Sequence, residues 1–244
     1  MLHRCFAYAF ALVCASGAAL AQTEPRGVVE LFTSQGCSSC PPADALLVEL
    51  ANDPSLVAVS VPIDIWDYLG WKDTLAVPRN TARQRGYAQA RGDGQVYTPQ
   101  AVVNGSVHVL GSDKAAIENA LAKSRRHGAM SLAGLTLTLA DGRMQVTLPE
   151  TKDLSANAEA WLCGLIRSAT IPIARGENKG RTITYRNVAR RWVKLGDWTG
   201  QSKSWTVPLQ TIAAEGIDEA AVFVQSGTAD KPKTMLGAAL AALK

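Results

Sequence analysis

Histidine and cysteine are scarce in this chain, and long apolar segments are missing from it. Among its 244 residues there are three histidines and five cysteines. A structural zinc site usually needs four Cys or His ligands, so we expect neither a bound metal nor a cofactor. No segment reaches the roughly 20 apolar residues that a membrane-crossing helix requires, so we expect no membrane span.

A strong charge imbalance and internal repeats are also missing. The formal net charge is +4, from 25 Lys and Arg against 21 Asp and Glu. Basic residues gather at positions 123–126 and 186–194, but no aromatic platform or nucleic-acid motif accompanies them, so we expect solvated faces and no nucleic-acid partner. The hydrophobic content of 47% is ordinary for a globular protein with a core.

The first 21 residues have the features of an export signal. Arg4 precedes an apolar stretch from about Phe6 to Val13, and small residues follow at Ala19 and Ala21. This order is typical of a signal peptide that is cut after Ala21. We therefore expect a secreted or periplasmic protein.

The cysteines divide between this leader and the mature chain. A lipid anchor on Cys14 is an alternative to simple cleavage, although Val13 is bulkier than the residue that such processing prefers. Export would leave Cys37, Cys40 and Cys163 in an oxidising compartment, where disulfides persist. Two of these can pair, and one is left over.

Residues after the leader predict alternating strands and helices. Gly27–Phe32 and Leu56–Trp66 are apolar runs typical of buried strands, and residues 43–53 between them form an amphipathic helix pattern. Two such strands joined by one helix should lie parallel, with ligands at their carboxyl ends. Further expected elements are a helix from Pro78 to Ala90 with Arg83, Arg85 and Arg91 facing solvent, a hairpin turning at Asn104-Gly105, and a helix from Asp113 to Lys123 capped by Ser112.

From about His127 onward the pattern changes to short strands. A hairpin pattern turns at Asp141-Gly142, and four further strand-like runs follow with few helix signals among them. The second half therefore predicts a small β-domain. Cys163 lies in one apolar run, AWLCGLI, which favours a buried free thiol over a third redox partner.

The segment SQGCSSCPP directly follows the first strand. Its two prolines lack N–H groups and are tolerated only in the first turn of a helix, so the helix should begin at about Ser38 or Ser39, capped by one of them. Cys37 then lies just outside that turn, where unpaired amides and the helix dipole favour a thiolate. We predict Cys37 as the nucleophile and Cys40 as the resolving thiol.

The expected function is thiol–disulfide exchange with a protein or small-molecule thiol or disulfide. A disulfide that closes so short a loop adds little stability, which weighs against a purely structural role. One alternative is a binding module without enzymatic activity whose disulfide stays closed. A less favoured alternative is copper(I) handling by the two thiolates.

A strand, a C-x-x-C at a helix start, a second strand and a later Thr-Pro resemble the thioredoxin and glutaredoxin superfamily. The matching residues are Cys37, Cys40, Thr98 and Pro99. The resemblance implies a cis Thr98–Pro99 bond opposite the cysteine pair. It also implies an α/β thioredoxin-like domain over residues 22–126, followed by a smaller all-β, sandwich-like domain over residues 127–244.

Trp66 and Asp67 end the second predicted strand, close to the expected cysteine site. Trp66 could form a wall of the substrate site and Asp67 could relay protons, so we include both with Thr98 and Pro99 as candidate substrate-binding residues. The alternative for this pair is a packed tryptophan followed by a turn-capping aspartate.

Several longer motifs resemble one bacterial secreted family, named domain of unknown function 1223 (DUF1223). The segments are ELFTSQGCSSCPPAD, WDYLGWKD, ARQRGYAQA, YTPQAVVNG and GENKGRTITYRNV, in this order along nearly the whole mature chain. The resemblance implies no activity, because the family has none assigned.

Overall fold

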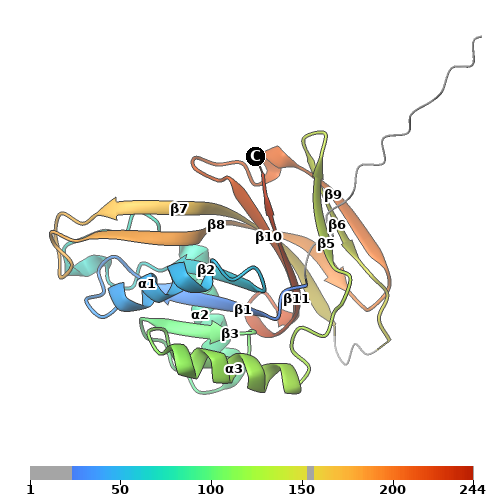
Figure 1. The fold of residues 1–244 in the computed structure, drawn as a ribbon, viewed down its shortest axis with the longest axis horizontal. Helices are drawn as coiled ribbons and strands as arrows, with labels where there is room; N and C mark the ends of the chain where they lie inside the picture. The colour runs from blue at the N-terminus through green and yellow to red at the C-terminus, as the bar shows by residue number, and fades with distance from the viewer. Residues whose placement is uncertain (1–23, 153–156, 244) are drawn as a thin grey trace, which may run out of the picture.

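The computed structural model describes residues 24–152 and 157–243 (Figure 1). The predicted leader, residues 1–21, lies outside the described residues. Within the described part of the chain there are eleven strands, three α-helices and two short 3₁₀-helices. None of these helices has the length and apolar character needed to cross a membrane.

The first half of the chain alternates strands and helices. Its elements are β1 (Gly27–Thr33), α1 (Pro41–Leu50), β2 (Leu56–Pro62), η1 (Asp67–Leu69), α2 (Pro78–Arg91), β3 (Gln100–Val103), β4 (Val107–Leu110) and α3 (Lys114–Arg126). The second half is built mostly of strands. Its elements are β5 (Thr136–Ala140), β6 (Arg143–Leu148), β7 (Ala158–Pro172), β8 (Thr182–Trp198), β9 (Lys203–Pro208), η2 (Leu209–Thr211), β10 (Glu219–Thr228) and β11 (Lys231–Ala242).

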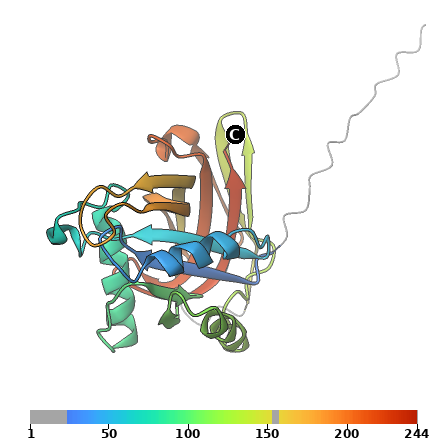
Figure 2. The same ribbon diagram turned by 60° about the vertical axis from the view of Figure 1, so that its left-hand side comes forward.

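One mixed sheet of eight strands organises the molecule, in the order β11-β10-β7-β8-β2-β1-β3-β4. β1 and β2 are parallel, as expected, and β3 lies antiparallel on the other side of β1. β8 joins this group through one parallel register position, Ser60 with Val188. A second sheet, β5-β6-β9, packs beside β11 (Figure 2).

The expected fold class, an α/β thioredoxin-like domain followed by a separate smaller all-β domain, is wrong. The large sheet takes strands from both sides of residue 126, and the fold is mostly β. The main core is shared in the same way, since Phe32 and Tyr87 of the first half cluster with Trp161 and Phe223 of the second. Local apolar patterns identify strands, but they do not say which strands pair.

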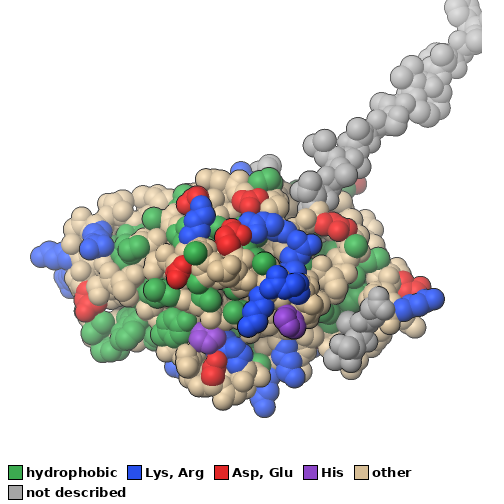
Figure 3. All heavy atoms as spheres, turned by 60° about the horizontal axis from the view of Figure 1, so that its bottom comes forward, with side chains coloured by type: hydrophobic (Ala, Val, Ile, Leu, Met, Phe, Trp, Pro, Cys, Tyr) green, Lys and Arg blue, Asp and Glu red, His purple; other side chains and the backbone are tan. Residues whose placement is uncertain are grey.

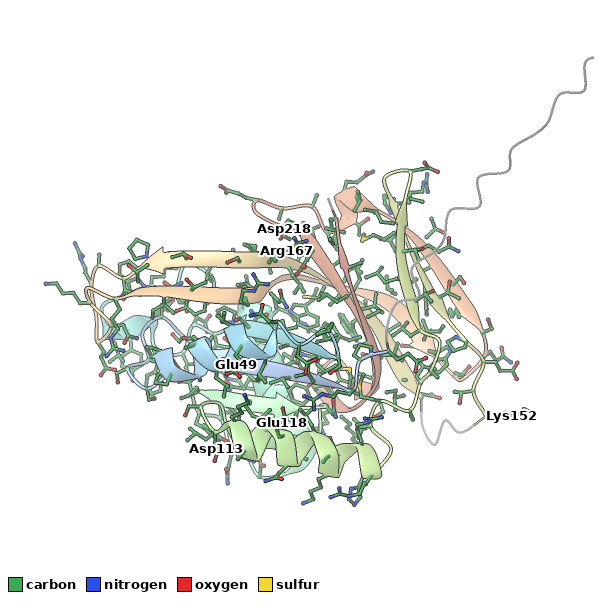
Figure 4. All side chains as sticks on the ribbon, viewed as in Figure 1. Glu49, Asp113, Glu118, Lys152, Arg167 and Asp218 are labelled. Atoms are coloured by element: carbon green, nitrogen blue, oxygen red, sulfur yellow. A yellow bond between two sulfur atoms is a disulfide. The ribbon has the colours of Figure 1, made fainter. Side chains whose placement is uncertain are left out.

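Predictions for individual elements were correct for the hairpin turn and displaced for one helix cap and one strand end. The hairpin turn falls at Asn104 and Gly105, which have φ of 47° and 70°, a left-handed conformation that this pair adopts readily. The predicted cap of α3 is wrong by one residue, because Asp113 rather than Ser112 accepts the N–H of Ala116, at 2.9 Å. Figure 4 shows Asp113 at the start of α3. β2 ends at Pro62, four residues before the expected end at Trp66.

The expectation that Arg83 faces solvent is wrong. α2 lies against both β2 and β11, so one side of the helix is enclosed. Arg83 is 5% exposed and donates to both carboxylate oxygens of Glu30, at 2.5 and 3.0 Å. It also donates to the hydroxyl of Tyr87 and to Gln225 of β10, so this polar group links the two halves of the chain.

Basic side chains gather on the face of the molecule that carries α3 (Figure 3). The last turn of α3 contributes Lys123, Arg125 and Arg126, all of them exposed. Cations near the carboxyl end of a helix interact favourably with its dipole. This cluster is therefore the solvated helix face that the sequence predicted.

Candidate functional site

The cysteine pair lies in the connection between β1 and α1, at the carboxyl end of β1. Cys37 and Cys40 form a disulfide, with their Cα atoms 5.4 Å apart. Two tight turns shape the connection, because the N–H of Cys37 donates to the carbonyl of Ser34 and the N–H of Cys40 to the carbonyl of Cys37. The segment places both sulfurs immediately before the helix.

The start of α1 differs from the prediction in a way that affects the sulfur. α1 begins at Pro41 with Cys40 as its N-cap, and no side chain caps it, so the expected serine cap is wrong. The two prolines have no N–H, and the next two amides, of Ala43 and Asp44, donate to the carbonyl of Cys40 at 2.9 and 3.0 Å. The first turn of α1 therefore offers Cys37 no free backbone donor, although the helix dipole remains.

The two cysteines differ in exposure. Cys37 is 6% exposed and Cys40 is fully buried, while Ser38 and Ser39 between them are exposed. The sulfur of Cys37 lies 3.4 Å from the hydroxyl oxygen of Ser39. Cys37 is therefore the more accessible residue of the pair, and Ser39 can donate a hydrogen bond to its sulfur.

A loop from the second half of the chain holds the cysteine segment in place. The side-chain amide of Asn178, between β7 and β8, donates to the carbonyl oxygens of Gln35 and Cys37, at 2.9 and 2.8 Å. Asn178 is fully buried. Its neighbour Glu177 accepts the N–H of Ser38 at 3.3 Å. The position of Cys37 thus depends on residues about 140 positions further along the chain.

Three of the four candidate substrate-binding residues lie next to the cysteine segment. The indole N–H of Trp66 donates to the Thr98 hydroxyl at 2.7 Å, and the Ser39 hydroxyl lies 3.5 Å from the Thr98 carbonyl oxygen. The predicted cis peptide bond between Thr98 and Pro99 is confirmed. Gly36 lets the chain pass close to Trp66, because a Cβ there would lie 3.1 Å from the Trp66 Cβ.

The fourth candidate, Asp67, contacts Asp73 and not the cysteine segment. Its carboxylate accepts the N–H of Asp73 at 3.0 Å, at the start of η1. No hydrogen bond of the described residues joins Asp67 to the cysteine segment. The structure therefore matches the turn-capping alternative for this residue rather than proton relay.

Asp73, which was not among the predicted site residues, also holds the cysteine segment in place. Its carboxylate accepts the N–H groups of Gln35, Leu75 and Ala76 at 2.8 to 3.0 Å. Burial raises its pKa to about 6, and these three hydrogen bonds oppose the rise. Asp73 thus fixes the residue two positions before Cys37.

A second buried carboxyl group, that of Asp44, lies one helical turn after Cys40. Asp44 is 1% exposed, and the hydroxyl of Thr33 donates to it at 2.7 Å. Burial raises its pKa to about 8, against the effect of the Thr33 hydrogen bond. This side chain is therefore largely protonated at neutral pH.

Two signals in the sequence could have drawn attention to these residues. Asp44 ends the segment ELFTSQGCSSCPPAD, and Asn178 lies in GENKGRTITYRNV, the segment furthest from the cysteines.

Cys163 is free and fully buried in the main core, and burial raises the pKa of its thiol, which confirms the expected buried thiol. Over residues 24–152 and 157–243, no group of three His, Cys, Asp or Glu side chains could hold a metal ion.

Comparison with known proteins places the chain in a family. Residues 28–225 match the family described as Protein of unknown function (DUF1223). A crystal structure of an Agrobacterium tumefaciens protein is 32% identical, with a TM-score of 0.81 over 92% of this chain and 97% of that one. HBP35 of Porphyromonas gingivalis is 15% identical, with a TM-score of 0.63 over 90% of this chain and 76% of that one, which shows similarity of fold alone. No curated protein matches the sequence. The chain belongs to the DUF1223 family.

Proposed function

We propose that this protein exchanges disulfides with thiols through Cys37 and Cys40. The observation that carries the proposal is the unequal exposure of the pair, since Cys37 is 6% exposed and Cys40 is fully buried. Exchange proceeds by attack of a thiolate on one sulfur, and access decides which sulfur is attacked. The partner is a protein or small molecule that carries a thiol or disulfide.

The reaction starts from the disulfide form. A partner thiolate attacks the Cys37 sulfur, the Cys37–Cys40 bond breaks, and Cys40 leaves as a thiolate that takes up a proton. A second partner thiolate attacks the partner sulfur of the mixed disulfide, which releases an oxidised partner and the reduced protein. In the reverse direction, the Cys37 thiolate attacks a partner disulfide, and Cys40 then attacks the Cys37 sulfur to release the reduced partner.

Surrounding residues have separate roles in this proposal. Ser39 donates to the Cys37 thiolate of the reduced protein, because its hydroxyl oxygen lies 3.4 Å from that sulfur. Trp66, Thr98 and Pro99 form the surface against which the partner sulfur approaches. Asp67 acts only indirectly, by holding the turn that positions Asp73.

Redox titration tests the proposal. Oxidised protein is incubated with increasing dithiothreitol under native conditions, and free thiols are counted by alkylation and mass spectrometry. We expect two thiols to become reactive, and Cys40→Ser to retain partners as mixed disulfides through Cys37. Cys37→Ser is the matched control and should trap none, because Cys40 is enclosed. If the bond yields to dithiothreitol only in urea, the closed-disulfide binding module is supported instead.

Export is part of the same proposal. The leader pattern in residues 1–21 would carry the chain to a compartment where its disulfide persists. Expression with the natural leader, followed by fractionation and N-terminal sequencing, should recover a chain that begins at Gln22. Recovery of the full-length chain with both cysteines reduced would contradict this part.

A further inference from the structure

One edge of β8 lacks a strand partner next to the cysteine site. β7 pairs with β8 from Thr182 onward, whereas β2 reaches β8 only at Val188. Within the described part of the chain, residues 182–186 of β8 therefore have no strand on the side away from β7. Unpaired strand edges present rows of N–H and C=O groups that can pair with another chain.

The register shows which backbone groups face this open side. The N–H of Ile173 donates to the carbonyl of Arg181, so this pair is hydrogen-bonded. Antiparallel pairs alternate between bonded and non-bonded, which makes Pro172 with Thr182 and Thr170 with Thr184 non-bonded pairs. The N–H and C=O of Thr182 and Thr184 consequently point away from β7.

A groove with a volume of about 550 Å³ runs along this edge. One wall is formed by Arg181 and by residues 182–184 of β8, and the opposite wall is formed by α1, which lies beside β8 (Figure 1). α1 turns only Pro41, Ala45 and Val48 to the groove. These residues share one face of the helix because they are four and three positions apart, and they are small enough to leave the β8 backbone accessible.

The groove lies next to the cysteine site along the chain on both of its walls. Pro41 lines it and directly follows Cys40. At the other wall, β8 begins four residues after Asn178, which holds the carbonyl oxygen of Cys37. A chain segment lying along the β8 edge would therefore pass beside the disulfide.

We propose that this groove binds an extended segment of the partner polypeptide, which adds as a strand to the open edge of β8. Main-chain hydrogen bonds supply affinity in this mode of recognition with little demand on the partner sequence. Among the described residues that line the groove, Arg181 alone is charged, so segments with an acidic residue near that end are favoured. The inference names the substrate class of the proposed exchange and in that respect rests on it, but the binding itself needs no sulfur chemistry.

A pair of proline substitutions on opposite edges of one hairpin tests the binding. Thr184→Pro removes the N–H that faces the groove, whereas Thr170→Pro removes an N–H on the far edge of β7. Both delete the same hydrogen bond, the 3.0 Å contact between the Thr170 and Thr184 hydroxyls, so they are matched in their effect on the hairpin. Proline is tolerated at strand positions whose N–H faces outward.

The probe is dye-labelled lysozyme that has been reduced and carboxamidomethylated, so that it stays unfolded and cannot exchange disulfides. Fluorescence anisotropy with the oxidised protein should show saturable binding that Thr184→Pro weakens at least tenfold and Thr170→Pro leaves within twofold. Native lysozyme should not bind. Equal affinity of Thr184→Pro and the unmodified protein, or equal loss in both variants, would overturn the proposal.

A substitution on the helix wall keeps the test decisive if either proline variant fails to fold. Ala45→Trp fills the groove from α1 and should also weaken binding at least tenfold. Ala82→Trp makes the same change at an exposed position of α2 outside the groove and should have no effect. Tight binding by Ala45→Trp would contradict the assigned groove.

Rates of exchange separate this inference from the proposed function. Thr184→Pro should slow the reaction with the disulfides of scrambled, unfolded lysozyme at least tenfold and leave the reaction with glutathione disulfide unchanged. If neither disulfide reacts while unfolded lysozyme still binds, the groove stands and the exchange function fails. If both disulfides react and Thr184→Pro changes neither rate, exchange stands and the groove proposal fails.

Discussion

Asn178 donates a hydrogen bond to the Cys37 carbonyl oxygen at 2.8 Å, across 141 positions of sequence. The same amide holds the Gln35 carbonyl oxygen, and no other described side chain donates to both ends of this turn. Cysteine geometry in this protein is therefore set by the second half of the chain as much as by the C-x-x-C segment itself.

Replacing Asn178 should loosen the cysteine segment. Asn178→Ala leaves the Gln35 carbonyl without its donor, while the Cys37 carbonyl keeps the N–H of Cys40. One buried acceptor without a partner costs about 1–3 kcal/mol, so we expect a loss of that size in urea unfolding. The disulfide should also be reduced faster by dithiothreitol. Glu177→Ala is the control, since its 3.3 Å contact is exposed and should contribute little. Unchanged reduction kinetics in Asn178→Ala would contradict the assigned role.

The buried ion pair of Arg83 and Glu30 should respond differently to single and double substitution. Arg83→Met leaves the Glu30 carboxylate buried and unpaired, and breaking such a pair costs about 3–5 kcal/mol. Combining it with Glu30→Leu should recover at least half of the loss, because no lone charge remains. Arg85→Met, at an exposed position of the same helix, should change the free energy of unfolding little. A double variant no more stable than Arg83→Met would be the contrary result.

Because burial raises the pKa of Asp44, the protein should become less stable as the pH rises. Burial raises the pKa of Asp44 from 3.8 to about 8, so between these values the folded state holds a proton that the unfolded chain has released. Stability supplied by that proton is lost toward high pH. The raised pKa of Asp73 also makes the protein less stable as the pH rises, but only up to about pH 6. The lowered pKa of His108 has the opposite effect, because it makes the protein more stable as the pH rises toward about 6.5.

The window from about pH 6.5 to 8 therefore isolates Asp44. We expect the urea midpoint of the unmodified protein to fall across it, and that of Asp44→Asn to stay level. Glu49→Gln, on the exposed side of the same helix, should follow the unmodified protein. A level midpoint in the unmodified protein would show that Asp44 ionises at its ordinary pKa.

Ser39 should lower the pKa of the Cys37 thiol in the reduced protein. Hydrogen bonds to a charged group are worth about 1.5–3 kcal/mol, so Ser39→Ala should raise that pKa by about one to two units. The pH dependence of iodoacetamide modification measures it, and buried Cys163 should stay unmodified. Ser38→Ala is the matched control, and a shift of the same size in both variants would exclude a specific role for Ser39.

Local signals in the sequence were sufficient for much of the cysteine site. An apolar run, two cysteines and two prolines located the disulfide between β1 and α1, and the resemblance to thioredoxins implied the cis bond at Pro99. The serine cap failed because the prolines push the helix start to Pro41 and leave no early amide for a serine to accept. The helix start depends on the carbonyl group to which the Ala43 and Asp44 amides donate, and the sequence alone does not show that this is the carbonyl of Cys40.

Long-range pairing could not be predicted in the same way. The runs that became β7 and β8 were recognised as strands, but their pairing with β10 and β2 depends on tertiary contacts that no local pattern encodes. Arg83 shows the same limit, because an arginine on an amphipathic helix ordinarily faces water, and here its partner Glu30 lies 53 positions away. Asn178 could be found only once the loop before β8 was placed against the cysteines.

The loop that carries Asn178 gives proteolysis a chemical consequence. A fragment ending at residue 126 would keep Cys37, Cys40 and the Thr98–Pro99 bend, yet it would lack the amide that pins the cysteine turn. Such a fragment would retain the sulfur pair and lose its alignment. A cut between the two halves would leave them joined through the shared sheet and core, so the cysteine turn would lose its alignment only when the halves separate.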